Sequence, residues 1–140
     1  MAEIKHGGAA GGIAAGLAAL LNAELVNGCD YFLSFTNFDE ELKKADLVIT
    51  GEGSIDEQTL QGKGPFGVAK KAKEKRIPVI GLAGKVPLEA NSLLEHDFDA
   101  MLSINNEPAK LSDALLNTEA NLVRTARAVG NLLCLQGMLK

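Results

Sequence analysis

The stretch Thr50–Pro65, TGEGSIDEQTLQGKGP, is the most informative part of this sequence. It combines glycines with carboxylates, hydroxyl groups and a lysine, and it follows the strand-like run ADLVI at Ala45–Ile49. In α/β proteins, ligands bind where parallel strands end, at their carboxyl edge. A plain connection rarely needs so long an irregular segment. We therefore predict a ligand site here, against the alternative of a solvated glycine-rich connection.

Apolar runs separated by helix-length segments predict an α/β fold around this loop. The run at 77–83 is continuously apolar, which is typical of a parallel strand covered on both faces. Strands are predicted at 30–35, 46–50, 77–83 and 98–104. Helices are predicted at 11–21, 39–44, 65–75 and 112–136, the last with a break near Asn117. This order predicts a three-layer, mainly parallel, Rossmann-like sheet with right-handed crossovers.

Composition restricts the class of protein. The chain has 140 residues, of which 46% are hydrophobic and 23% charged, as expected for one soluble globular domain. Its net charge of −4 and the lack of a basic patch argue against nucleic-acid binding. The apolar run 9–21 is too short to cross a membrane and lacks the features of a signal peptide. Cys29 and Cys134 have no zinc-site spacing, and we expect them to be reduced in the cytoplasm.

Two common nucleotide-binding motifs are excluded by spacing. A P-loop needs a glycine where Glu57 stands and a serine or threonine where Gly64 stands. A dinucleotide-binding fingerprint beginning at Gly51 needs a third glycine where Asp56 stands. The loop is therefore expected to bind anions by another design.

The loop nevertheless has the chemistry of a phosphate site. A helix beginning near Pro65 would point its positive end toward an anion, with Lys63 just before it. Glu52 and Asp56 could hold Mg²⁺, which prefers a few carboxylates together with water and phosphate oxygens. The alternatives are a surface charge for Lys63 and a turn or capping role for the two acids. Backbone N–H groups could meet phosphate oxygens at four glycines: Gly51, Gly53, Gly62 and Gly64.

Four segments, in order, resemble the bacterial type of glycerate kinase. They are GAAGG at Gly8–Gly12, ITGEGSIDEQTLQGKGPFGVAKKAK at Ile49–Lys73, PVIGLAG at Pro78–Gly84 and FDAMLSI at Phe98–Ile104. The long central segment is the most specific, and the resemblance covers almost the whole chain.

This resemblance implies ATP-dependent phosphorylation of D-glycerate with Mg²⁺, giving the 2-phosphate. It also implies two α/β domains with the active site in the cleft between them. Family members are more than twice as long, and their DSFKG-like and DGGEGT-like segments are absent here. The chain thus resembles the C-terminal part of the kinase, and we expect the N-terminal part as its partner, with homo-oligomers possible. Residues 1–27 would be a glycine-rich segment with a buried helix from the interdomain region, and residues 28–140 the Rossmann-like domain.

Carried over to this sequence, the resemblance places the site in the loop that faces the cleft, and the chemistry of the loop residues predicts their roles. Asp56 and Lys63 are the predicted catalytic residues, and Glu52 and Asp56 the predicted Mg²⁺ ligands. Substrate or nucleotide would be bound by Gly51, Glu52, Gly53, Gln58, Thr59, Gly62 and Gly64. Without its missing part the chain is expected to be inactive. Two alternatives stay open: a non-catalytic nucleotide- or anion-binding module, and a structural domain whose glycines only form turns.

Overall fold

A computed structural model describes residues 7–56, 64–87 and 92–136 of the chain. These residues divide into two compact units, one within Met1–Lys44 and the other within Ala45–Lys140. Neither unit contains, in its described part, a helix with the length and apolar character needed to cross a membrane. The two units meet between Lys44 and Ala45, whereas the sequence predicted a domain boundary between residues 27 and 28. The predicted boundary concerns the domains of the longer protein and stays a prediction.

The first unit is entirely helical in its described part. Its elements are η1 (Ala9–Gly12), α1 (Ile13–Leu21), α2 (Gly28–Phe35) and α3 (Phe38–Leu42). Helix α1 begins later than predicted because Gly11 and Gly12 have φ angles of 70° and 94°, outside the helical region. Only Ala15 of this helix is buried, whereas the large apolar side chains Leu20 and Leu21 are 84% and 71% exposed. The sequence predicted that this helix is buried, but the described residues leave its large apolar side chains exposed.

The strand predicted at 30–35 is wrong, because these residues form helix α2. The side chain of Asn27 accepts a hydrogen bond from the Asp30 N–H at 3.1 Å and caps the helix. Tyr31 and Phe35 then stack one helical turn apart, with ring centroids separated by 6.3 Å. The aromatic residues suggested a strand, but the cap and the spacing of these rings favour a helix. Helix α3, predicted at 39–44, is confirmed in position.

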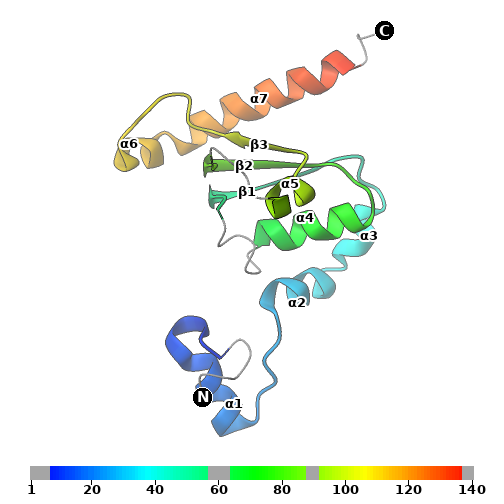
Figure 1. Ribbon diagram of the computed structural model, residues 1–140, viewed down its shortest axis with the longest axis vertical. Coiled ribbons are helices and arrows are strands. Elements are labelled where there is room, and N and C mark those ends of the chain that lie inside the picture. The colour runs from blue at the N-terminus through cyan, green and yellow to red at the C-terminus, as the bar shows by residue number, and fades with distance from the viewer. Residues whose placement is uncertain (1–6, 57–63, 88–91, 137–140) are drawn as a thin grey trace. The chain divides into compact units, whose positions relative to one another are not determined.

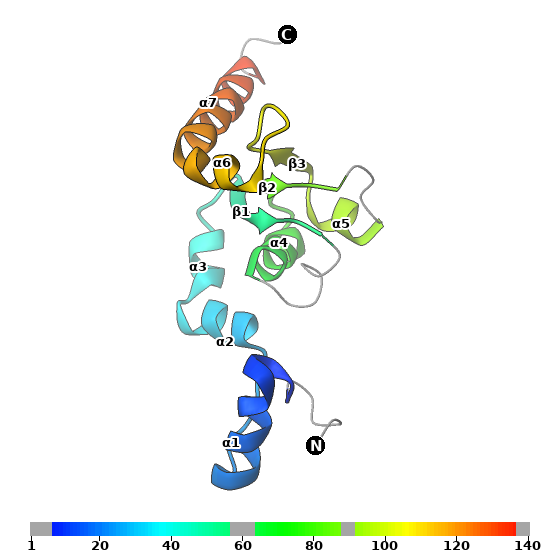
Figure 2. The ribbon, with the colours of Figure 1, turned by 90° about the vertical axis from the view of Figure 1, so that its left-hand side faces the viewer.

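The second unit is an α/β domain, shown in Figures 1 and 2. Its three strands pair in parallel, as predicted, and their order in the sheet is β1–β2–β3. The other elements that were predicted also occur, and α5 is an additional helix. The elements are β1 (Val48–Ser54), α4 (Gly64–Glu74), β2 (Val79–Lys85), α5 (Ser92–Asp97), β3 (Ala100–Ser103), α6 (Leu111–Leu116) and α7 (Thr118–Gln136).

Helices cover both faces of this sheet. Both views place α4 and α5 on one side of the strands and α7 on the other. Helix α4 packs on β1 and β2 through Ala69 and Ala72, which are fully buried. On the opposite face, Val129 of α7 packs against Leu82 and Ile104. The predicted three-layer arrangement is therefore confirmed for this unit.

The break predicted near Asn117 separates α6 from α7. The Asn117 side chain donates a hydrogen bond to the Asp113 carbonyl at 2.9 Å. The hydroxyl of Thr118 donates to the Ala114 carbonyl at 3.1 Å. Both side chains thus bond carbonyl groups in the last turn of α6, and the Asp113 carbonyl also accepts the Asn117 backbone N–H at 3.0 Å.

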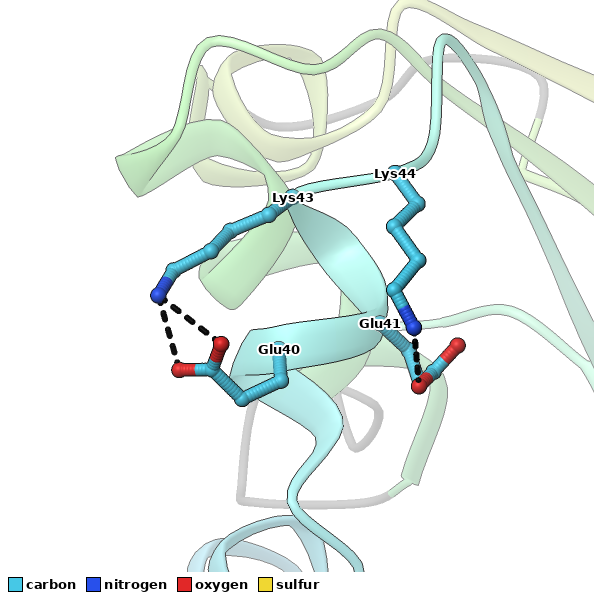
Figure 3. A network of polar contacts seen from close by, with 4 residues as sticks. All are labelled: Glu40, Glu41, Lys43 and Lys44. Carbon is cyan, nitrogen blue, oxygen red and sulfur yellow. Dashed lines mark hydrogen bonds and ion pairs between the residues drawn. The ribbon is translucent and has the colours of Figure 1, made fainter.

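Asp99 ties three elements together at the amino edge of the sheet. Its carboxylate accepts a hydrogen bond from the Val79 N–H at 2.7 Å and from the Lys73 ammonium at 2.6 Å. Its own N–H donates to the Val79 carbonyl at 2.9 Å. By contrast, the exposed ion pairs Glu40–Lys43 and Glu41–Lys44 join α3 to the two residues that follow it (Figure 3). Asp99 therefore contributes more to the fold than the α3 pairs do.

We expect Asp99→Ala to lower the free energy of unfolding by about 1–2 kcal/mol, because the Val79 N–H loses a charged acceptor. Glu40→Ala is the matched control, since it removes an exposed ion pair and should change stability by less than about 0.5 kcal/mol. Urea denaturation near pH 7 measures both variants. Equal losses would contradict the role assigned to Asp99.

The effect of Asp99 should also depend on pH. The hydrogen bond from Lys73, followed by that from the Val79 N–H, holds the pKa of the Asp99 carboxyl below its ordinary value. A lowered pKa stabilises the fold above the unfolded value of about 3.9, and this contribution is lost as the pH falls through the folded pKa. The stability difference between wild type and Asp99→Ala should therefore narrow below about pH 4. A constant difference across this range would show that the charge is unimportant.

Candidate functional site at the carboxyl edge of the sheet

The first half of the predicted loop is part of the sheet. Strand β1 continues through Gly51 and Gly53 to Ser54, which pairs in register with Lys85 of β2. The prediction that the strand ends at Thr50 is therefore wrong. The reason is long-range, because β2 supplies hydrogen-bonding partners beyond the apolar run that signalled the strand.

Two positions between β1 and β2 have no room for a side chain. A Cβ atom on Gly51 would collide with the backbone carbonyl oxygen of Leu82. A Cβ atom on Gly84 would lie 2.8 Å from the Gly53 carbonyl oxygen, which is also too close. Since backbone atoms cannot move aside as a flexible side chain can, these two positions require glycine. A Cβ atom on Gly53, by contrast, would meet nothing within 4 Å.

Asp56 follows directly after an anchored residue. Ile55 is 1% exposed, and its N–H donates to the Lys85 carbonyl at 2.9 Å. Its side chain packs beside Gly81, where an added Cβ atom would lie 2.9 Å from the Ile55 Cδ1 atom. Burial of Ile55 therefore determines where the chain leaves the sheet and where Asp56 lies. The Ser54 hydroxyl donates to the Asp56 carboxylate at 3.3 Å.

A cleft of about 910 Å³ opens at this edge of the sheet. Glu52 and Ser54 of β1 line it, together with Lys85 at the end of β2 and Asn105 after β3. The other lining residues are largely apolar and come from the strands, α6, α7 and the segment before α6. A cleft of this size, with apolar walls and a few polar groups, is typical of small-molecule sites.

The polar groups after β3 are held in place by α7. The Asn105 side chain donates to the Gly84 carbonyl at 2.7 Å and accepts from the Asn121 side chain at 3.3 Å. Arg124 donates to the Ile104 carbonyl at 2.6 Å, which fixes the same corner. These bonds position the end of β2, where Lys85 lines the cleft.

Sequence reasoning missed Lys85 and Asn105 as site residues. A signal existed for Lys85, because Gly84 and Lys85 follow a predicted strand just as Gly51 and Glu52 follow another. Asn105 gave no such signal, since an asparagine after a strand is ordinary turn chemistry. The Asn105 side chain is held in position by the side chain of Asn121, which is distant in sequence and close to Asn105 only after folding.

The structure brings together only part of the predicted site. Gly51, Glu52, Gly53 and Asp56 lie at the carboxyl end of β1, and Gly64 begins α4. Glu52 lines the cleft, but no group of three or more potential metal-ligating side chains occurs among the residues that the structure describes. Four predicted residues lie outside the described part: Gln58, Thr59, Gly62 and Lys63.

The fold and site define a class of protein. A parallel α/β domain with glycines, carboxylates and a lysine at the carboxyl edge of its strands is typical of domains that bind phosphorylated small molecules. The family model described as "Glycerate kinase family" matches residues 1–134. The chain therefore belongs to the glycerate kinase family, as the sequence resemblance indicated, and so to a family of phosphotransferases.

Individual relatives agree with this assignment. A "Glycerate kinase" of Halalkalibacterium halodurans is 44% identical over 92% of this chain and 34% of its own length. A "Glycerate 2-kinase" of Escherichia coli K12 is 37% identical over 95% of this chain and 35% of its own length. A crystal structure from Salmonella typhimurium LT2, described as a glycerate kinase 2, superposes with a TM-score of 0.69. That structure is 44% identical, and the match covers 95% of this chain and 34% of the other. The chain thus spans about a third of the relatives that it matches.

The two strand glycines allow a matched test. We expect Gly51→Ala to lower the free energy of unfolding by about 1–3 kcal/mol, because the new methyl group meets the β2 backbone. Gly53→Ala should stay within about 0.5 kcal/mol of wild type, because the space beside Gly53 is open. Urea denaturation followed by circular dichroism measures both. If both variants were equally stable, the close approach of β1 and β2 would not be a real constraint.

Proposed function

We propose that the longer protein to which this chain corresponds transfers the γ-phosphoryl group of ATP to D-glycerate. The observation that supports this proposal most directly is family membership, joined to a cleft lined by Glu52 and Lys85 at the strand ends. The relative named glycerate 2-kinase favours 2-phosphoglycerate as the product. A glycerate hydroxyl oxygen would bond to the γ-phosphorus while the bond from that phosphorus to the ADP oxygen breaks.

The chain's own residues would act mainly by position and charge, as phosphoryl transfer requires. Asp56 would hold the metal or accept the proton of the attacking hydroxyl, and Lys63 would neutralise the transferring phosphate oxygens. Gly51, Gly53, Gly62 and Gly64 would present backbone N–H groups, and Gln58 and Thr59 would hydrogen-bond glycerate or phosphate. The position of Lys85 in the cleft supports a further role in binding anionic oxygens.

Mg²⁺ would be held by Glu52 and Asp56. Their carboxylates, which lie at the end of one strand and just beyond it, suit a hard cation that takes its other ligands from water and phosphate. The ion would supply charge neutralisation on the phosphate oxygens. The other partner of this chain would be the rest of the kinase polypeptide, and homo-oligomers are compatible with this assignment.

We also propose that the protein acts in the cytoplasm. One observation supports this: Cys29 and Cys134 are both free thiols, as expected in a compartment where disulfides are rare. Burial raises the pKa of the Cys29 thiol, which makes it a poor nucleophile at neutral pH.

In the longer kinase, Asp56→Asn should reduce kcat by about a hundredfold or more, because it removes the proton acceptor and a metal ligand. Lys63→Ala should reduce kcat by about the same factor through lost charge stabilisation. Lys70→Ala is the matched control, since Lys70 is exposed on α4 and should leave kcat unchanged. Steady-state kinetics and thermal melts on all three variants separate chemistry from folding. Near-full turnover of Asp56→Asn would contradict its catalytic role.

This chain alone should phosphorylate D-glycerate slowly or not at all. Phosphoryl transfer depends on positioning, and the chain holds about a third of the relatives' length. A coupled ADP-release assay with Mg-ATP tests this. Turnover on the order of 10 per second, a typical enzyme value, would show that the chain is catalytically complete. If ATP binds but the longer protein gives no turnover either, the non-catalytic binding module is the better description.

A further inference from the structure

A second cavity lies at the amino edge of the sheet, between the ends of α4 and α5 and the start of β2. We call it the amino-edge cavity. Its volume is about 460 Å³, and its lining residues are Lys73, Arg76, Ile77, Pro78, His96 and Asp99. Strand β2 begins at this edge and ends at Lys85 in the cleft, so the length of the strand separates the two cavities. A ligand here would be additional to the ligands of the proposed reaction.

Arg76 occupies a backbone position that favours glycine. Helix α4 ends in a Schellman motif, in which the Ile77 N–H donates to the Ala72 carbonyl at 3.0 Å and the Arg76 N–H donates to the Lys73 carbonyl at 2.9 Å. This motif gives Arg76 a φ angle of 60°, in the left-handed region, where any side chain is less favourable than glycine. Within the described part of the second unit, Arg76 alone among residues other than glycine has a positive φ. Glycine at this position would therefore suit the fold better.

The charge of Arg76 is not needed to end the helix. Cations near the C-terminus of a helix interact favourably with its dipole, but Lys71 and Lys73 already lie in the last turn of α4. Backbone strain that the fold does not require is found most often at functional sites. The strained position of Arg76 therefore indicates a role for its side chain rather than for its backbone.

The carboxylate in the amino-edge cavity does not pair with Arg76. One oxygen of Asp99 accepts a hydrogen bond from the Lys73 ammonium at 2.6 Å, and the other accepts from the Val79 N–H at 2.7 Å. The Arg76 guanidinium has no hydrogen-bonding or ion-pair partner among the residues that the structure describes. Because Lys73 and Asp99 neutralise each other, Arg76 gives the cavity wall a net positive charge.

We propose that the amino-edge cavity binds a small organic anion, whose carboxylate or phosphate group is held by Arg76. A guanidinium group donates two parallel hydrogen bonds to either kind of oxyanion, which gives geometric selectivity as well as affinity. Ile77 and Pro78 add apolar wall that suits the carbon skeleton of such a ligand. The volume of the cavity is within the range of small-molecule sites.

Binding can be tested by titrating this chain with inorganic phosphate and, separately, with succinate. Amide NMR spectra report where each anion binds, and sodium chloride keeps the ionic strength constant so that screening does not change. We expect saturable shifts at residues 76–77 and 96–99 with at least one of the two anions. The anion that binds more tightly shows whether the site prefers a phosphate or a carboxylate.

Arg76→Gly is the decisive variant, because it should weaken binding while stabilising the fold. Loss of a charged hydrogen-bonding group should weaken anion binding by about tenfold or more. Relief of the left-handed backbone should raise the melting temperature by about 2–5 °C. Lys70→Ala is the matched control, since Lys70 is an exposed cation of α4 that does not line the amino-edge cavity. It should bind both anions as wild type does.

Three results would overturn the proposal. The first is that neither anion causes saturable shifts at residues 76–77 and 96–99, including the case in which shifts occur only at the cleft. The second is that Arg76→Gly binds no more weakly than Lys70→Ala does, which would show a diffuse effect of charge. The third is that Arg76→Gly lowers the melting temperature, which would show that the arginine serves the fold. Glycerate phosphorylation by the longer protein is a separate measurement, and its failure would count against the proposed function only.

Discussion

The close parallel pairing of β1 and β2 is the constraint on which the rest of the second unit depends. It requires glycine at 51 and 84, because any side chain there would meet the backbone of the neighbouring strand. Because of this pairing, β1 continues to Ser54, beyond the apolar run that ends at Ile49. The next residue, Ile55, is buried. Asp56 and the start of the cleft are positioned from that anchor. The helices α4 and α7 cover the two faces of this sheet.

The same residues thus serve the fold and the proposed chemistry. From sequence alone, the pattern at 51–53 can be taken as a phosphate-binding turn or as a structural turn. The structure supports neither description in full, because these residues are strand and Gly51 is required for strand packing. Gly53 differs, since it lines the cleft with open space beside it. Of Gly51 and Gly53, it is therefore Gly53 whose glycine the strand packing leaves unexplained.

Family membership and activity are separate matters for this chain. The family match covers residues 1–134, but relatives are about three times as long. The polar groups described here line one cleft: Glu52 of β1, Lys85 at the end of β2, and Asn105, whose side chain is held by Asn121 of α7.

The sequence by itself determined the family, the parallel α/β class and the approximate positions of β1, β2, β3, α4 and α7. Those elements depend on local patterns, namely continuous apolar runs and helical spacing. Such patterns can be recognised in each segment without knowing what it packs against. It failed at residues 30–35, where aromatic residues favoured a strand but the Asn27 cap produced a helix. Only the tertiary structure decided that β1 runs through its glycines, that Asn105 is fixed by Asn121, and that Lys85 lines the cleft with Glu52. Each of these depends on contacts between residues far apart in the chain, and such contacts exist only once β1, β2 and α7 have packed together.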